Sequence, residues 1–208
     1  MLTESLTRAI THSLTRKPTD PGVGGWTPAQ WFLASEQGIW LDPSDFATMF
    51  QDAAGTTPVT AVGQPVGKIL DKSGRGNHAT QVTAAARPVL QQDGNGKYYL
   101  AFDGVDDCLV TGSIDFTNTD KMTVVAGVRS NLNGYSNILE LGPNSASENG
   151  FSLQRGFAAN GDYAGSVYGT SLGYGLTSNF AAPDTSVIAA QYDIAQASVV
   201  GGEISFRR

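Results

Sequence analysis

Cysteine and histidine are scarce in this chain of 208 residues, which has one cysteine and two histidines. The single cysteine, Cys108, excludes an intrachain disulfide. Its apolar neighbours Leu109 and Val110 indicate a strand, so we expect Cys108 to be a buried small hydrophobic residue. With His12 and His78 as the histidines, few side chains could act as a base beside a nucleophile, so we expect no cysteine-based catalysis.

Long apolar runs are also missing. No stretch reaches the ~18 apolar residues of a membrane span, and residues 1–17 lack the apolar core of a secretory signal. We therefore expect no membrane insertion and synthesis in a reducing cytoplasm. Cationic side chains are outnumbered, with 13 Lys and Arg against 19 Asp and Glu, and the net charge is -6. Because an acidic surface repels phosphate backbones, we expect no nucleic-acid partner.

Glycine, in contrast, is abundant at 25 residues, and the chain is rich in Ser, Thr and Asn. This balance favours strands joined by many turns. Beyond Ile39, apolar side chains recur at every second position in several segments, which is the period of a half-buried strand. These segments are 98–102, 122–128, 151–154, 188–193 and 203–207. The sequence therefore predicts an all-β fold, an antiparallel two-sheet sandwich.

The N-terminal residues have a different period. Apolar side chains recur every four residues, which predicts a helical arm over residues 1–17 with one apolar stripe. An isolated helix of this length is marginally stable in water, so we expect the stripe to pack against the sandwich, a sister subunit or another protein. The stripe consists of Leu2, Leu6, Ile10 and Leu14.

Prolines and glycines then interrupt the chain. They predict a linker followed by a short helix within residues 18–37. The helix is expected to have Thr27 as its N-cap and Pro28 as its first residue, and to end near Gly38. The sandwich is expected to occupy residues 38–208 and to open with one helical turn ending at Phe50. The last segment, 204–208, reads as a strand with no successor, so we expect the closing hairpin to be missing. Either the chain is a fragment of a longer one, or its last strand completes a sheet with another subunit.

Two polar loops carry a resemblance. Residues 71–79 read DKSGRGNHA, and residues 100–109 read LAFDGVDDCL. A D-x-S-G-x-G-N-H loop followed by F-D-G-x-D-D resembles the concanavalin A-like lectin and laminin-G-like superfamily. Residues 39–45 and 50–59 resemble the version found in structural proteins of tailed bacteriophages and prophages.

The resemblance implies a jelly roll of two packed antiparallel sheets. Many members of the superfamily bind glycans, some of them through a calcium ion. Because hard cations prefer oxygen ligands, the carboxylates and the amide of the two loops are candidate calcium ligands. The alternative is that both loops are turns in which aspartate side chains cap their own backbone. The candidate ligands are Asp71, Asn77, Asp103, Asp106 and Asp107.

Enzyme motifs are weak. Residues 169–173 match G-x-S-x-G, but a Gly-rich stretch follows where that motif needs a helix, and no histidine lies downstream. The E-x-D-x-x-E strand of related glucanases is absent. Aromatic residues beside amide and carboxyl groups are an alternative site for stacking sugars, unless they are buried in the sandwich. They are Tyr135, Tyr163, Tyr168 and Tyr174, with Asn133, Asn137, Asn160 and Asp162 nearby.

The sequence thus favours a non-enzymatic structural protein of a bacteriophage virion, made in the bacterial host cytoplasm. It would be a decoration, fibre or tail-associated component without a cofactor, unless calcium binds the loops. We expect a homo-oligomer anchored to other virion proteins by its arm. The alternatives are a lectin module for host surface glycans and a glycoside hydrolase.

Overall fold

The computed structural model describes residues 28–32, 37–116, 121–131, 134–141, 150–156, 161–168, 172–176, 180–193 and 205–207. The chain forms two compact units, Met1–Ile114 and Asp115–Arg208, so a boundary falls inside the segment 38–208 that the sequence treats as one sandwich. Both units are built of antiparallel strands, with short 3-10 turns in the first, which confirms the all-β prediction. Within the described ranges, no helix has the length and hydropathy to cross a bilayer.

The predicted arm, with Leu2, Leu6, Ile10 and Leu14, lies outside the described residues. The short helix after the linker is present as the 3-10 turn η1 (Pro28–Trp31). It does not extend to Gly38, because residues 37–40 are not helical. Pro28 begins the turn as predicted, since its fixed φ suits the first position of a helix.

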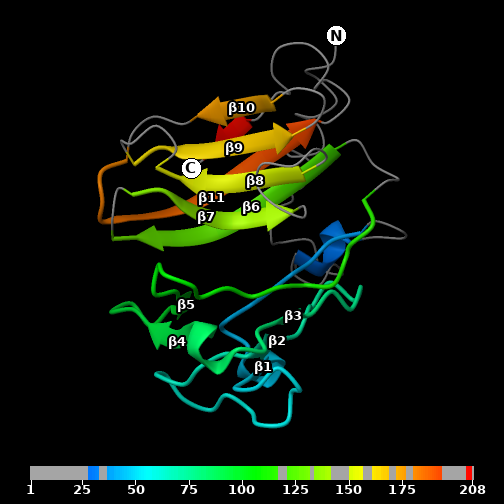
Figure 1. Cartoon of the computed structure of the whole chain (residues 1–208), viewed down its shortest axis with the longest axis vertical. Helices are drawn as coiled ribbons and strands as arrows, with labels where there is room; N and C mark the ends of the chain where they lie inside the picture. Colours follow the sequence, from blue (N-terminus) through cyan, green and yellow to red (C-terminus); the bar gives the residue numbers. More distant parts are fainter. Residues whose placement is uncertain are drawn as a thin grey trace, which may run out of the picture. The chain divides into compact units, whose positions relative to one another are not determined.

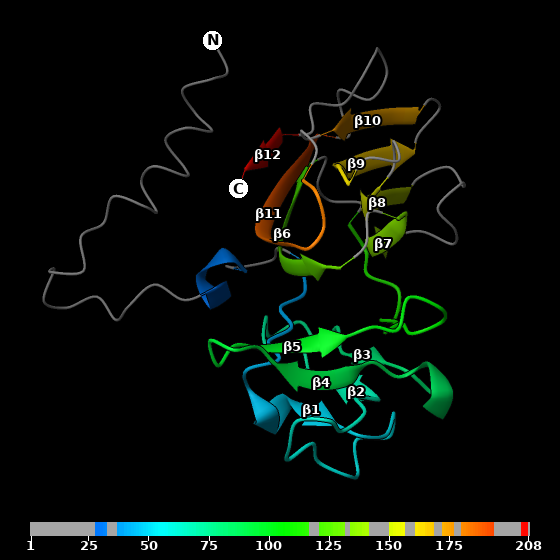
Figure 2. The same cartoon turned by 90° about the vertical axis from the view of Figure 1, so that its left-hand side faces the viewer.

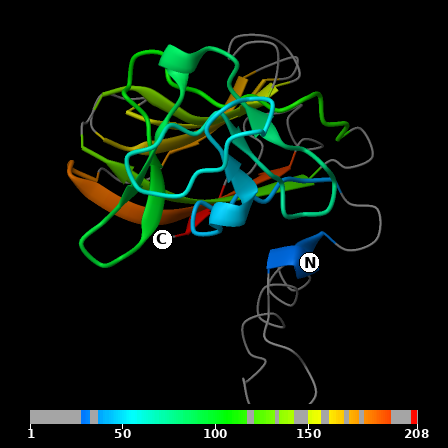
Figure 3. The ribbon, with the colours of Figure 1, turned by 90° about the horizontal axis from the view of Figure 1, so that it is seen from below.

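The first unit contains short strands joined by turns (Figure 3). One sheet has the order β1-β2-β3 and a hairpin pairs β4 with β5. Glycine and proline are frequent in this region, and prolines cannot donate to a sheet ladder, so no strand among its described residues exceeds four residues. The elements are η2 (Phe46–Thr48), β1 (Met49–Phe50), β2 (Lys68–Ile69), β3 (Ala79–Thr80), η3 (Ala84–Ala86), β4 (Val89–Gln92) and β5 (Tyr98–Ala101).

The core of the first unit is one apolar cluster drawn from strands and loops alike, namely Met49, Val59, Val66, Ile69, Ala79 and Leu90. The predicted helical turn is η2, but it ends at Thr48, and Phe50 already lies in β1. Cys108 is exposed, so the prediction of a buried cysteine is wrong. Its segment is held by an isolated bridge between Thr80 and Val110 and not by a continuous strand, which leaves the thiol outside the core.

The second unit contains longer strands in two sheets (Figure 1). A four-stranded sheet has the order β10-β9-β8-β7, and a three-stranded sheet has the order β12-β11-β6. The strands are β6 (Lys121–Ser130), β7 (Ser136–Leu141), β8 (Gly150–Arg155), β9 (Tyr163–Tyr168), β10 (Leu172–Leu176), β11 (Asp184–Asp193) and β12 (Ser205–Arg207).

Strict alternation of burial shows why β6 and β11 form. In β11, Ile188, Ala190 and Tyr192 are buried, while Thr185 and Val187 are exposed. Ten register pairs join β11 to β6, from Asp184↔Ser130 to Asp193↔Lys121. Because side chains in a strand alternate between faces, this pairing puts one apolar face of both strands into the core. Each large apolar side chain buried there contributes roughly 1.5–3 kcal/mol.

The two sheets of this unit pack face to face, as the edge-on view in Figure 2 shows. Phe151, Leu153 and Tyr163 from the four-stranded sheet form one cluster with residues of β11. The rings of Phe151 and Tyr192 lie 5.1 Å apart between centroids, and the Tyr192 hydroxyl donates to the backbone carbonyl of Ser152 at 3.0 Å. Aromatic contacts of this kind are typical of a core between two sheets.

The last strand has a partner within the chain. β12 pairs with β11 through Ala189↔Arg207, Ala190↔Phe206 and Gln191↔Ser205. The strand itself was predicted from its period of two, but its pairing with β11 was not. Pairing along a strand far away in the sequence cannot be read from local alternation, because it depends on the order of strands in the sheet.

Candidate functional site

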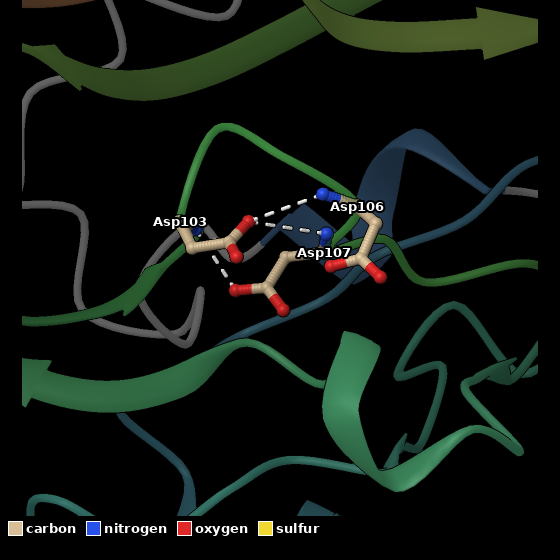
Figure 4. A group of neighbouring side chains, drawn as sticks. All are labelled: Asp103, Asp106 and Asp107. Atoms are coloured by element: carbon tan, nitrogen blue, oxygen red, sulfur yellow. Dashed lines mark hydrogen bonds between the residues drawn. The ribbon is translucent and has the colours of Figure 1, made fainter.

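The loop after β5 brings three of the candidate ligands together. The carboxylates of Asp103, Asp106 and Asp107 lie within 4.8 Å of one another (Figure 4). Gly104 has a φ of 76°, a left-handed conformation that glycine adopts without strain and that turns the chain here. Asp103 and Asp106 are exposed, and Asp107 is half-buried.

Hydrogen bonds inside this loop orient its carboxylates (Figure 4). Oδ1 of Asp103 accepts the backbone N–H groups of Val105 at 2.8 Å, Asp106 at 3.2 Å and Asp107 at 3.3 Å. In return, Oδ2 of Asp107 accepts the N–H of Asp103 at 2.9 Å. The bond from Val105 is the main cause that lowers the pKa of the Asp103 carboxyl below its usual range. The loop is therefore stable as an Asx-type turn made of protein groups alone.

The same carboxylates could also hold a hard cation. Calcium takes six to eight oxygens, so three carboxylates would need water molecules to complete the shell. Asp106 contributes most freely, because its carboxylate is exposed and its neighbour Asp103 uses one oxygen for the turn. Calcium binding by this loop stays a hypothesis.

Asp71 has a different surrounding, and it is not a member of that group of three. This residue is 8% exposed, and its carboxylate accepts four hydrogen bonds. Oδ1 receives the N–H groups of Trp40 at 2.9 Å and Ser73 at 2.8 Å, while Oδ2 receives the Ser73 hydroxyl at 2.7 Å and the N–H of Asn77 at 3.0 Å. We call this set the Asp71 network.

Electrostatics favour the ionised form of Asp71. Burial raises the pKa of this carboxyl, but the hydrogen bonds from Ser73, Trp40 and Asn77 outweigh it and hold the pKa below its usual range. The amide of Asn77 donates to the carbonyl of Gly38 at 2.7 Å, and Nδ1 of His78 accepts the N–H of Asp71 at 3.0 Å. The polar side chains of the D-x-S-G-x-G-N-H loop thus form hydrogen bonds with the backbone of the loop itself and of Gly38 and Trp40.

Two ion pairs of Lys72 join the same loop to residues 39–45. The Lys72 ammonium lies 2.9 Å from Asp42 and 2.8 Å from Asp45, and 4.6 Å from the centre of the Trp40 ring. Residues 100–109 are attached to the first unit by another contact, because Nε2 of Gln81 donates to the backbone carbonyl of Cys108 at 3.1 Å. The segments that carry the superfamily resemblance therefore pack into the first unit together.

The second unit holds a buried polar network absent from the predictions. Arg155 and Asp184 are 1% and 6% exposed, with 3.5 Å between Nη1 and Oδ2. The same Asp184 oxygen accepts the hydroxyls of Tyr163 at 2.8 Å and Ser186 at 2.9 Å, and Arg155 donates to the carbonyl of Phe180 at 2.8 Å. The sequence held a signal for this network, because Arg155 follows Phe151 and Leu153 at the next inward position of the strand. A charged residue at such a position is usually interpreted as the end of a strand.

The candidate aromatic residues lie in three different surroundings. Tyr163 is fully buried and belongs to the core, as the alternative interpretation held. Tyr168 and Tyr174 lie in β9 and β10 and not in loops. Tyr135 is 57% exposed, and its hydroxyl donates to Oδ1 of Asn137 at 3.3 Å. Asp162 is buried, while Asn133 and Asn160 lie outside the described residues.

The G-x-S-x-G match at 169–173 does not form a nucleophile elbow. Residues 169–171 lie outside the described part of the chain, and Leu172 and Gly173 begin strand β10. The motif needs a helix at that place.

Comparison with known proteins finds no matching family model, no matching curated protein and no matching solved structure.

Proposed function

We propose that this chain is a non-enzymatic structural component of a bacteriophage virion, a decoration, fibre or tail-associated protein that displays a concanavalin A/laminin-G-like jelly roll. Its arm, residues 1–17, would anchor it to other virion proteins, and the chain would assemble as a homo-oligomer. Residues 38–208 would form the displayed part.

The observation that supports the proposal is how the shared motifs are used. The aspartate, serine and asparagine of residues 71–77 accept or donate hydrogen bonds that fix neighbouring backbone. A motif whose polar groups are engaged in this way stabilises a scaffold and leaves little for catalysis. The face-to-face sheets of the second unit suit a jelly roll as well.

Particle assembly tests the proposal. We expect a chain with Leu2, Leu6, Ile10 and Leu14 all changed to serine to remain outside purified particles, because the apolar stripe would no longer bind its partner. Changing Thr3, Thr7 and Thr11 to alanine is the matched control and should leave incorporation intact. Normal incorporation of the serine variant would contradict an anchoring role for the arm.

A second candidate function, recognition of host surface glycans, is favoured by one observation. Tyr135, Asn137 and Glu140 are exposed and hydrogen-bonded in series, with 3.0 Å between Nδ2 of Asn137 and Oε2 of Glu140. A glycan array probed with the whole chain, with and without calcium, tests it. Cleavage of a bound glycan that Asp103→Asn or Asp107→Asn abolishes would instead favour a glycoside hydrolase.

A further inference from the structure

Exposed apolar side chains gather in one segment of the first unit. Phe102, Val105 and Val110 are 53%, 85% and 59% exposed, and we call these three residues the Val105 surface. In the rest of this unit that the structure describes, the exposed large apolar side chains are Val62 and Val82. A single exposed apolar residue is ordinary, but several that lie together mark a surface that binds a partner.

The backbone holds the Val105 surface in one place. Oδ2 of Asp107 accepts the N–H of Asp103 at 2.9 Å, which closes a turn with Val105 in its middle. The segment that leaves the turn is fixed as well, because Val110 donates to the carbonyl of Thr80 at 2.9 Å and accepts its N–H at 2.8 Å. The three apolar side chains therefore belong to one short, ordered stretch of chain.

The Val105 surface is negatively charged. The carboxylates of Asp103, Asp106 and Asp107 lie between its apolar residues and within 4.8 Å of one another (Figure 4). Residues 98–114 contain no lysine or arginine. Among the described residues, no salt bridge neutralises the three carboxylates, and Arg87 donates to backbone carbonyls. A partner that fits this surface combines apolar with cationic side chains.

The N-terminal residues 1–17 have this combination. Their apolar stripe, defined above from the period of four, supplies leucine and isoleucine side chains. Their charged residues are Arg8, Arg16 and Lys17 against the one acid, Glu4. The arm is thus basic where the Val105 surface is acidic, and apolar where it is apolar.

The arm can reach this surface in its own chain. It joins the first unit at η1, where Nη2 of Arg75 donates to the carbonyl of Phe32 at 2.8 Å. Residues 18–27 span at most about 36 Å when extended, whereas a compact unit of about 100 residues has a radius of gyration of about 13 Å. A segment tethered so closely has an effective concentration in the millimolar range, far above that of a second copy at micromolar concentration.

We infer that residues 1–17 bind the Val105 surface of the same chain. The apolar stripe packs on Phe102, Val105 and Val110, and the basic side chains lie beside the carboxylates. In the free chain this contact covers both apolar surfaces, so a partner that binds the arm has to displace it. The inference goes beyond the proposed virion role and does not depend on it, because it concerns the chain before any assembly.

The single cysteine gives a direct test, because Cys108 is exposed and lies within the same segment. A reagent with a maleimide and an amine-reactive ester on a short spacer is added to the whole chain at micromolar concentration. Mass spectrometry then identifies the linked peptides. We expect Cys108 to be linked to Lys17 or to the N-terminal amino group. Links confined to lysines beyond residue 60 would overturn the inference.

Variants of the surface give a second test, with trypsin cleavage after Arg8 and Arg16 as the readout. Changing Phe102 and Val105 together to serine should raise the cleavage rate about tenfold and abolish the cross-link, because the stripe loses its apolar partner. Val62→Ser, also exposed in the first unit, is the matched control and should leave both readouts at the values of the parent chain. Equal cleavage of the parent and the double variant would contradict the contact.

The charge of the surface is tested separately. Asp106 is exposed, so Asp106→Asn should leave the fold intact and raise the cleavage rate about twofold at low salt. Added salt should raise the cleavage rate of the parent chain in the same direction, since it screens exposed charges. No change in either measurement would remove the charge complementarity on which the choice of the arm depends.

A mixture of isotope-labelled and unlabelled chains distinguishes the chain's own arm from that of a second copy. We expect each cross-link to join two peptides of the same isotope type, with a yield that does not depend on protein concentration. Links between labelled and unlabelled peptides would overturn the assignment to the same chain and give the Val105 surface to the arm of a second copy.

Discussion

The two compact units satisfy their backbone groups in opposite ways. In the first unit the strands are two to four residues long, and aspartate side chains accept the N–H groups that no strand partner accepts. In the second unit β6 and β11 are ten residues long, and their ladder pairs the backbone directly. The Asp184 carboxylate in this unit accepts hydrogen bonds from other side chains, namely Arg155, Tyr163 and Ser186.

This difference explains why aspartate is a poor guide to function in this chain. Backbone N–H groups must find an acceptor wherever they are buried, and a carboxylate is a strong one. Asp52 shows the pattern clearly, because it accepts the N–H groups of Gly55, Thr56 and Thr57. A loop rich in aspartate can therefore be a substitute for a strand and need not be a ligand site.

The largest effect is expected in the second unit. Asp184→Ala removes the buried carboxylate that lies 3.5 Å from Arg155 and accepts the hydroxyls of Tyr163 and Ser186, which should lower the free energy of unfolding by about 3–5 kcal/mol. Urea unfolding measures it. Thr185→Ala, one residue further along β11 and exposed, should stay within about 0.5 kcal/mol of the parent. A loss below about 1 kcal/mol for Asp184→Ala would mean that the side-chain network contributes little beside the long ladder.

The next effect tests the first unit. Asp71→Ala removes the acceptor of Trp40, Ser73 and Asn77, and we expect a loss of about 2–3 kcal/mol. Hydrogen exchange followed by mass spectrometry should show lost protection in peptides over 38–45 and 71–78. Peptides from β6 and β11 serve as the internal control and should keep their protection. Equal loss in both units would contradict the independence of their stabilising interactions.

The pH dependence of stability is a further test of the role of Asp71 in the first unit. Because the folded protein holds the pKa of Asp71 below the ordinary 3.8, this residue stabilises the fold fully above that value. The stabilisation is lost as the pH falls through the lower pKa of the folded state. Denaturation curves recorded between pH 7 and acid should therefore show a shallower decline for Asp71→Asn, which is already weaker at pH 7. Parallel curves for the variant and the parent would exclude Asp71 as a source of acid sensitivity.

The smallest effect concerns calcium. With three carboxylates and one oxygen of Asp103 occupied by the turn, we expect the loop to bind calcium no more tightly than the millimolar range. Isothermal titration calorimetry of the parent chain and of Asp106→Asn measures this. The variant should lose the signal while keeping its Tm. Micromolar binding would instead make the loop a true cation site.

Much of the second unit was predictable from the sequence. The period of two in residues 122–128 and 188–193 marked β6 and β11, because side chains on a strand face alternate sides. Burial of Phe151 and Leu153 followed from the same rule. Burial of Ser152 and Gln154 did not, since the rule assigns polar residues at alternate positions to solvent. Whether these two side chains are buried depends on which distant segments cover them, and local alternation carries no information about that.

The candidate ligands were only partly predictable. Clustering of Asp103, Asp106 and Asp107 followed from their closeness in sequence and from the turn at Gly104. Asp71 was also a candidate calcium ligand, but its carboxylate accepts the backbone N–H of Trp40, which lies far away in the sequence. A sequence does not show which distant N–H group will lack an acceptor, so it cannot tell a structural carboxylate from a ligand.

By itself the sequence determined the kind of fold: its alternating apolar residues form antiparallel strands, and its Gly and Asp residues form the turns, because both depend on neighbours within a few positions. The tertiary structure alone decided the pairing of β12 with β11, the placement of Arg155 against Asp184, and the burial of Gln154. These depend on which distant segments meet, since partner and burial are set by long-range packing and not by a residue's own neighbours.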